Sequence, residues 1–463
     1  MITVIGLGAE RGDVTARGLA AAKAADRVFV RTQTHPSAQS LTDAGIAFES
    51  FDAFYERSRS YDALVKNIVR EVRRAGKEQN VCYCVDGSPA EDRAARALMQ
   101  YRQTIAVEGV SKASAAAAKA GIGDFLALSA YDVTAAKLVR PLVVYDLADR
   151  VQAADVKLAL CDAFGDESPA FFVCGGKAQK IALFEADRQK SYDATCALVL
   201  PDVPLLEKKR FDLWDFIAIL KRLRAPDGCP WDRVQTHSSI RINAIEEAYE
   251  LVDAIDADDP AKMCEEAGDV IMQAAFHTLI EEERGNFNMT DVLSEVCEKL
   301  ITRHTHVFGS DRAAGADGAL TVWEKNKMKE KGQETFSDSV NDVPEGFPAL
   351  LRAQKVRKRM EKGGWARGTA AEVSARLSSS LTAFENAKEK ADAEAALSEI
   401  LWECAALGRT AGVDCEQALL DRAKRAQKEY TAFEARVLAD GKDVNALSAE
   451  ERARYMDEAK RDS

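Results

Sequence analysis

The sequence changes character close to Pro204, and this change limits the folds that the chain can adopt. Before it, runs rich in β-branched residues alternate with helical stretches, and the strand-like runs are residues 2–5, 28–31, 81–85, 104–107, 142–147, 170–174 and 196–200. Such alternation predicts an α/β domain with a largely parallel sheet. Beyond Pro204, Ala, Glu, Lys, Leu and Arg dominate with helical periodicity. We therefore expect only helices from Phe211 to the end.

Length and composition set further limits. A chain of 463 residues is expected to form two or three domains, and we predict them over residues 1–203, 211–365 and 366–463. The net charge of −12 argues against nucleic-acid binding. The ten cysteines form no C-x-x-C pair, which favours reduced thiols and a cytoplasmic location. The chain opens on a strand and contains no apolar run of membrane-spanning length, so we expect neither a signal peptide nor a membrane partner.

Two acidic clusters stand out in the helical part. The first is E-E-x-x-E at Glu246, Glu247 and Glu250, and the second is E-x-x-D at Glu266 and Asp269. Residues three apart lie on one helix face, and residues 258–260 predict a turn between the two helices. Antiparallel helices would then gather four carboxylates, whose mutual repulsion a cation such as Mg²⁺ relieves. The alternative is a pair of solvated acidic faces.

Motifs on either side of these clusters favour the first interpretation. They are C-P-W-D-x-x-Q-T-H at residues 229–237 and R-H-x-H-V-F-G at residues 303–309. With E-E-x-x-E and E-x-x-D, they resemble the MazG family of nucleoside triphosphate pyrophosphohydrolases, closely over about residues 211–365. The resemblance implies an all-α fold and Mg²⁺-dependent cleavage of NTPs or dNTPs to the nucleoside monophosphate and pyrophosphate. Two metal ions could neutralise the phosphates and generate the attacking hydroxide.

The resemblance also implies roles for single residues. The metal ligands would be Glu247, Glu250, Glu266 and Asp269. Glu246 would orient the attacking water or take its proton, or else cap a neighbouring group. Lys299 and Arg303, four apart on one helix face, would hold the triphosphate, with a solvated basic pair as the alternative. Trp231 would either stack on a base or anchor its loop in the core.

The helical part contains a weak internal repeat. The basic segments at residues 219–224 and 350–355 are each followed by a tryptophan, at positions 231 and 365. In the second unit the acidic positions are mostly lost, and the corresponding residues are Ala375, Arg376, Ser379, Ala396 and Glu399. A single acid holds a divalent ion poorly. We interpret residues 366–463 as a degenerate structural unit and expect the helical region to form a homodimer or a larger homo-oligomer.

The N-terminal part carries a different set of motifs. They are V-D-G-S-P at residues 85–89, V-E-G-V-S at 107–111, L-S-A-Y-D at 128–132 and L-V-V-Y-D-L at 142–147. In this order they resemble the tetrapyrrole (corrin/porphyrin) methylase family over about residues 1–201. The resemblance implies S-adenosylmethionine as a cofactor, in a cleft formed by Gly87, Pro89, Val110 and Ser111.

This part also departs from the methylase pattern. Residues 9–11 lengthen the first loop, and the acidic pair Glu91 and Asp92 follows the later one. Extra negative charge near a cofactor carboxylate is unfavourable. Two alternatives therefore remain for this domain, a methyltransferase and an inactive scaffold that keeps the fold. For the whole chain the alternatives are a pyrophosphohydrolase, a tetrapyrrole methyltransferase whose helices only assemble the oligomer, both activities together, or a non-catalytic interaction module.

Overall fold

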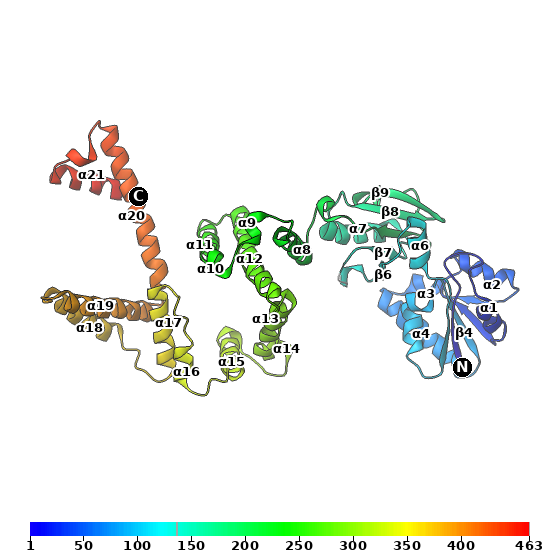
Figure 1. Ribbon diagram of the computed structural model, residues 1–463. Coiled ribbons are helices and arrows are strands. Elements are labelled where there is room, and N and C mark those ends of the chain that lie inside the picture. The colour runs from blue at the N-terminus through cyan, green and yellow to red at the C-terminus, as the bar shows by residue number, and fades with distance from the viewer. Residues whose placement is uncertain (136–137, 463) are drawn as a thin grey trace. The chain divides into compact units, whose positions relative to one another are not determined.

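The computed structural model describes residues 1–135 and 138–462 (Figure 1). The chain divides into two compact units, Met1–Ile280 and Glu281–Ser463, which are described separately. In the described residues every strand lies in the first 200, and helices make up the remainder. The predicted fold class, an α/β domain followed by an all-α region, is confirmed.

Ten strands form two five-stranded sheets in the N-terminal domain. The first sheet contains β1 (Ile2–Gly6), β2 (Arg27–Val30), β3 (Glu49–Ser50), β4 (Val81–Val85) and β5 (Thr104–Val107). The second contains β6 (Leu126–Ser129), β7 (Leu142–Tyr145), β8 (Pro169–Cys174), β9 (Lys177–Ala182) and β10 (Ala197–Leu200). Around the sheets lie the helices α1 (Ala16–Lys23), α2 (Gln39–Asp43), α3 (Asp52–Arg57), α4 (Tyr61–Gly76), α5 (Arg93–Met99), α6 (Lys112–Ala120) and α7 (Arg150–Phe164).

The first sheet is parallel throughout, in the order β3-β2-β4-β1-β5. Its central strand β4 is buried along its whole length because helices cover both faces, which explains its unbroken apolar sequence. Tyr83 packs on the side of α4 and α5, whereas Cys84 packs on the side of α1 and α2. This alternation follows from the two-residue period of a strand.

The second sheet differs from the predicted, largely parallel arrangement. Its order is β6-β7-β10-β8-β9, and only β6 and β7 run parallel, while the other three pairs are antiparallel. The prediction of a largely parallel sheet was therefore wrong for this half of the domain. For the pair β8 and β9 the reason is local, because Gly175 and Gly176, both with positive φ, turn the chain directly from one strand into the next without a crossover helix.

The rest of the first unit is helical. It contains α8 (Leu213–Arg224), α9 (Pro230–Arg233), α10 (His237–Ile240), α11 (Asn243–Asp256) and α12 (Pro260–Glu283). The second unit contains α13 (Met289–Arg303), α14 (Thr305–Phe308), α15 (Gly315–Glu330), α16 (Phe336–Asn341), α17 (Ala349–Lys362), α18 (Ala370–Glu385), α19 (Lys390–Ala411), α20 (Cys415–Ala439) and α21 (Ala449–Asp462). None of the described helices combines the length and apolarity that crossing a membrane requires.

Candidate functional site

A short turn sets the relation between α11 and α12, the helices that carry the acidic motifs. Asp258 adopts a left-handed conformation with a φ of 52°, which aspartate tolerates better than most residues. The Asp259 carboxylate accepts hydrogen bonds from the backbone N–H groups of Ala261 and Lys262, each 3.1 Å long. Pro260 occupies the first position of α12, where its missing N–H costs nothing. The predicted turn is therefore present, and it reverses the chain between the two acidic motifs.

Three carboxylates converge between these helices. Glu247 on α11 and Glu266 and Asp269 on α12 each offer one oxygen, and these oxygens lie within 4.8 Å of one another. We call these three residues the acidic cluster. Glu266 is the most buried of them, with 4% of its surface exposed. Glu250, the fourth predicted ligand, is exposed and lies outside this set of close oxygens.

The surroundings of the two glutamates in the acidic cluster raise their pKa values. Removal from water raises the pKa of Glu247, and the charges of Asp269 and Glu250 raise it further. Removal from water also raises the pKa of Glu266, with the charge of Glu250 as the next cause. Glu250 therefore lies near enough to act on both glutamates. Like-charged carboxylates held this close bind protons or a cation more readily than separate ones do.

The acidic cluster fits a hard divalent cation. Mg²⁺ prefers carboxylate oxygen ligands, and three of them converge here from two helices. The amide of Gln273, one turn after Asp269 on α12, lies 3.5 Å from a Glu247 oxygen and can orient that ligand. Sequence reasoning missed Gln273. Its signal was the four-residue spacing from Asp269, which places both residues on one helix face.

The segment that contains α9 and α10 is held by its own polar side chains. Gln235 donates to the Trp231 carbonyl at 3.0 Å, and its side-chain oxygen accepts from the Ser239 hydroxyl at 2.6 Å. His237 contacts His277 on α12, with 2.7 Å between their Nδ1 atoms. The indole of Trp231 is 60% exposed, so the alternative of a core anchor is wrong for this tryptophan. An exposed indole leaves base stacking open to it.

Lys299 and Arg303 lie on α13 in the second unit. Lys299 pairs with Glu295 at 2.6 Å. Arg303 forms two hydrogen bonds with the Glu330 carboxylate, 2.8 and 2.9 Å long, and its guanidinium lies 5.4 Å from the Trp323 ring centre. The hydrogen bond to Glu330 raises the pKa of Arg303. Carboxylates therefore hold both cations in place.

In the proposed degenerate unit, Arg376 and Glu403 form an ion pair. Arg376 corresponds to Glu247 in the repeat, and its guanidinium donates to Glu403 on α19 at 3.1 Å. Arg357 on α17 contacts the other oxygen of Glu403 at 3.0 Å. Glu403 is only 6% exposed, so its charge is balanced by these two arginines. Two guanidinium groups thus supply positive charge in this unit, whereas the ammonium of Lys262, 4.0 Å from Glu266, lies beside the acidic cluster.

In the N-terminal domain, the residues predicted to form a cofactor cleft meet around Glu91. The Glu91 carboxylate accepts hydrogen bonds from the backbone N–H groups of Ser88, Lys112 and Ala113, each 2.9 Å long, and from the Ser111 hydroxyl at 2.8 Å. It therefore caps the N-terminus of α6 as a bound anion would. A Cβ atom at Gly87 would lie 2.3 Å from this carboxylate.

These loops do not fit the carboxylate of S-adenosylmethionine. The backbone N–H groups of Ser88, Lys112 and Ala113 are already bonded to Glu91, whose own charge would repel a second carboxylate placed against them. The other predicted positions do not change this result. Pro89 is buried in the turn that begins after Gly87, and Val110 is 44% exposed.

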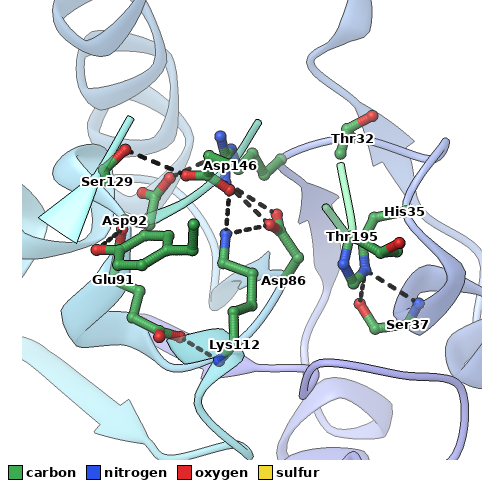
Figure 2. Close-up of polar contacts among 12 residues, drawn as sticks. Thr32, His35, Ser37, Asp86, Glu91, Asp92, Lys112, Ser129, Asp146 and Thr195 are labelled. Atoms are coloured by element: carbon green, nitrogen blue, oxygen red, sulfur yellow. Dashed lines mark hydrogen bonds and ion pairs between the residues drawn. The ribbon is translucent and has the colours of Figure 1, made fainter. Parts of the chain in front are cut away.

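A buried ion cluster joins the two sheets of this domain (Figure 2). Arg31 and Asp86 follow strands of the first sheet, Asp146 follows β7 of the second, and Lys112 begins α6. The Lys112 ammonium lies 2.5 Å from both Asp86 and Asp146, and Arg31 lies 2.9 Å from Asp86. Burial alone would raise the pKa of Asp86, but the charges of Arg31 and Lys112 hold it below its ordinary value. Asp92 lies 3.5 Å from Arg31, and burial raises its pKa.

No motif in the sequence marks Arg31 and Lys112 as members of a cluster. The available signal was a charged residue directly after an apolar strand, since the carboxyl ends of parallel strands meet at one edge of a sheet. In this domain the charges satisfy one another and leave both cations neutralised. We therefore interpret the cluster as a structural link between the sheets.

Comparison with known proteins agrees with the two sets of motifs. Residues 235–308 match the family model of the MazG nucleotide pyrophosphohydrolase domain, and residues 1–175 match that of the tetrapyrrole (corrin/porphyrin) methylases. The chain is 31% identical over 376 residues to the uncharacterized protein YabN of Bacillus subtilis. This match covers 77% of this chain and 76% of YabN.

Two shorter relatives are named as nucleoside triphosphate pyrophosphohydrolases. Over 246 residues the chain is 33% identical to the nucleoside triphosphate pyrophosphohydrolase/pyrophosphatase MazG of Thermotoga maritima, covering 53% of this chain and 94% of that protein. It is 30% identical over 251 residues to the nucleoside triphosphate pyrophosphohydrolase of Escherichia coli K12, covering 53% and 95%. The chain therefore belongs to the MazG family of nucleotide pyrophosphohydrolases. Within that family, it carries an additional N-terminal domain of the tetrapyrrole methylase family, as its likeness to YabN reflects.

Proposed function

We propose that this enzyme hydrolyses nucleoside triphosphates or deoxynucleoside triphosphates, between the α- and β-phosphates, to the monophosphate and pyrophosphate with the help of Mg²⁺. The observation that carries the proposal is the convergence of Glu247, Glu266 and Asp269 within 4.8 Å. The names of the pyrophosphohydrolase relatives describe the same class of reaction.

The acidic cluster would hold the cation, and Glu250 would join it as a further ligand. Bound Mg²⁺ would neutralise charge on the phosphates and lower the pKa of a water molecule. Because burial and neighbouring charges raise the pKa of Glu247 and Glu266, protons would compete with the cation for these side chains as the pH falls. Glu246, exposed beside Glu247, would orient the attacking water or accept its proton.

The remaining predicted residues would bind the substrate. For Lys299 and Arg303 we propose contacts with phosphate oxygens, for which a guanidinium offers paired donors. The exposed face of Trp231 would stack on the base, and such stacking does not depend strongly on the identity of the base. A broad substrate range would suit the removal of excess or non-standard nucleotides from a cytoplasmic pool.

The test is pyrophosphate release from a panel of NTPs and dNTPs with Mg²⁺. We expect release by the wild type and at least about 100-fold less by Glu250→Gln, because the variant loses a ligand charge. Glu265→Gln is the matched control, since Glu265 is an exposed acid outside the acidic cluster. Activity of Glu250→Gln equal to that of the control would remove Glu250 from the proposal, and no release by the wild type would refute the activity.

The helical region also supports a proposal about assembly. Large apolar side chains are exposed on α8 and α11, including Trp214, Ile245 and Ile255. Exposed apolar helix faces are typical of helical units that assemble into oligomers. We propose a homodimer formed through the helical region. Light scattering after gel filtration at micromolar concentration tests this, and a monomeric mass would contradict it.

We propose no methyl transfer by the N-terminal domain. Glu91 uses the backbone donors that the cofactor carboxylate would need, and the ion cluster beside it is internally neutralised. A domain can keep the fold of a family without its activity. The proposed role of this domain is therefore that of a scaffold.

A further inference from the structure

Two cysteines face each other across neighbouring strands of the second sheet. Cys174 is the last residue of β8, and Cys196 directly precedes β10. These strands are antiparallel, with Val173 opposite Ala197, so Cys174 and Cys196 form the next pair in register. Their Sγ atoms lie 2.6 Å apart. Both cysteines are reduced in the structure.

This placement meets the geometric requirements of a disulfide bond. Opposite residues of an antiparallel pair have Cα atoms about 4.5–5.5 Å apart. This spacing falls within the range of about 4.4–6.8 Å that disulfides span. The two sulfur atoms are also nearer to the disulfide bond length of about 2.05 Å than to an ordinary van der Waals contact of about 3.5–4.0 Å.

We propose that Cys174 and Cys196 are a redox-active pair that forms a reversible disulfide by exchange with a small-molecule disulfide such as oxidised glutathione. The two cysteines differ in access. Cys174 is partly exposed, whereas Cys196 is 1% exposed. Cys174 is thus the residue that a soluble disulfide reaches, and Cys196 lies directly behind it as the resolving thiol.

The exchange proceeds in two balanced steps. The thiolate of Cys174 attacks one sulfur of the oxidised glutathione, forms a mixed disulfide and releases one glutathione thiolate. The sulfur of Cys196 then attacks Cys174, forms the internal disulfide and releases the second glutathione thiolate. Two electrons pass from the cysteine pair to the glutathione disulfide. The two protons that the cysteines lose end on the two glutathione molecules.

Asp193 is placed to assist the second step. Its carboxylate oxygen Oδ1 accepts the Cys196 S–H at 3.6 Å, and its backbone N–H donates to the Cys196 sulfur at 3.3 Å. Burial raises the pKa of the Cys196 thiol, and the hydrogen bond that this thiol donates to the Cys174 sulfur adds to this. Cys196 is therefore protonated at neutral pH and needs an acceptor for its proton when it attacks. The Asp193 carboxylate can receive the proton and pass it to the departing thiolate.

The same three residues offer ligand atoms that a metal ion could use. The sulfurs of Cys174 and Cys196 and a carboxylate oxygen of Asp193 lie within 4.8 Å of one another. However, thiolates bound to one tetrahedral Zn²⁺ at about 2.3 Å would lie roughly 3.7 Å apart. The observed 2.6 Å is much shorter and favours the disulfide. Zinc binding is therefore the competing outcome that the experiment must separate.

The redox state of the pair would act on a neighbouring pocket. Gly175, Asp193 and Thr195 lie next to the two cysteines in sequence and line a pocket of about 360 Å³ in the same domain. A disulfide would tie these two segments together. The oxidised protein would then hold this side of the pocket more rigidly than the reduced protein.

The test equilibrates the full-length reduced protein in glutathione buffers of increasing oxidising strength, followed by rapid alkylation and peptide mass analysis. We expect loss of two thiols and a linked peptide pair containing Cys174 and Cys196, about 2 Da lighter than the reduced pair. Excess reduced glutathione should reverse the change. In Cys196→Ser, Cys174 should retain one glutathione, whereas in Cys174→Ser residue 196 should stay reduced. Cys161→Ser is the control, and its Cys174–Cys196 linkage should match that of the wild type.

Three results would overturn the proposal. One is that both thiols remain free in buffers that fully oxidise a reference dithiol. Another is that both cysteines accept glutathione singly and no linked peptide forms. The third is that the protein, titrated with Zn²⁺ alone, binds one ion through Cys174 and Cys196 with release of protons and protection of both thiols from alkylation.

Discussion

Replacing Asp269 by asparagine should have opposite effects on stability in the absence and in the presence of Mg²⁺. The change keeps the shape of the side chain and removes one charge from the acidic cluster. Oxygens of Asp269 and Glu247 lie within 4.8 Å of each other. Two like charges at this distance repel by about 1 kcal/mol in water. Because the side chains are partly solvated and salt screens them, we expect the metal-free variant to be more stable than the wild type by at most about 1 kcal/mol.

Magnesium should reverse this order. A ligand at 100 times its dissociation constant stabilises the folded protein by about 2.7 kcal/mol. The wild type should gain stabilisation of this kind from Mg²⁺, while Asp269→Asn should lose most of it together with pyrophosphate release. Thermal denaturation with and without Mg²⁺ measures both effects. Glu265→Gln removes an exposed charge from the same helix outside the acidic cluster, so it should respond to Mg²⁺ as the wild type does. An undiminished Mg²⁺-dependent shift in Asp269→Asn would refute the assignment of this residue as a ligand.

Three further predictions concern pH and the two buried ion clusters. The raised pKa values of the two glutamates in the acidic cluster mean that protons compete with Mg²⁺ at pH values above the ordinary glutamate range of about 4.3. Magnesium affinity measured by calorimetry should therefore increase as the pH rises through that region, and a flat profile would contradict the shifts. Because folding raises the pKa values of these two glutamates, their protonation adds to the free energy of unfolding of the metal-free protein. This contribution is complete below the unfolded-state pKa and is lost as the pH rises through the folded-state pKa. Arg357→Met should lower the free energy of unfolding, measured in urea, by about 3–5 kcal/mol because it removes a buried partner of Glu403. The side chain of Arg376 is 47% exposed, so Arg376→Met should lower it by less than about 1 kcal/mol. Equal losses in the two variants would contradict this prediction. Lys112→Met leaves Asp86 and Asp146 buried without the ammonium that pairs with them. The N-terminal domain of this variant should therefore unfold at a lower urea concentration, while pyrophosphate release is retained. An unchanged unfolding transition would show that the ammonium does not stabilise the domain.

The strands could be predicted where burial leaves a clear pattern in the sequence. The apolar run at β4 was predicted at its observed bounds because a parallel strand covered on both faces is continuously hydrophobic. The edge strand β5 was predicted from its β-branched residues, although it is partly exposed. Three strands were missed, for different reasons. β3 has only two residues, β6 contains no β-branched residue, and β9 lies at the sheet edge with half of its residues polar and exposed.

The candidate site could also be predicted only in part: the helix faces follow from nearby residues, whereas the distance between the helices does not. Helical periodicity was enough to place Glu266 and Asp269 on one face of α12, and the turn before Pro260 was readable from its residue types. The convergence of Glu247 with that face also depended on how the two helices pack. That packing brings three of the four predicted carboxylates within 4.8 Å and leaves Glu250 outside.

By itself, then, the sequence determined the two kinds of domain, the faces of the acidic helices and the family motifs, because each of these depends on residues a few positions apart. Only the tertiary structure decided that Glu91 caps α6, that Lys112 bridges Asp86 and Asp146, and that Cys174 faces Cys196. The partners in these contacts are about 20 to 35 positions apart in sequence, where no periodicity links them. Their meeting is fixed by strand order and register, which are set by burial across the whole domain.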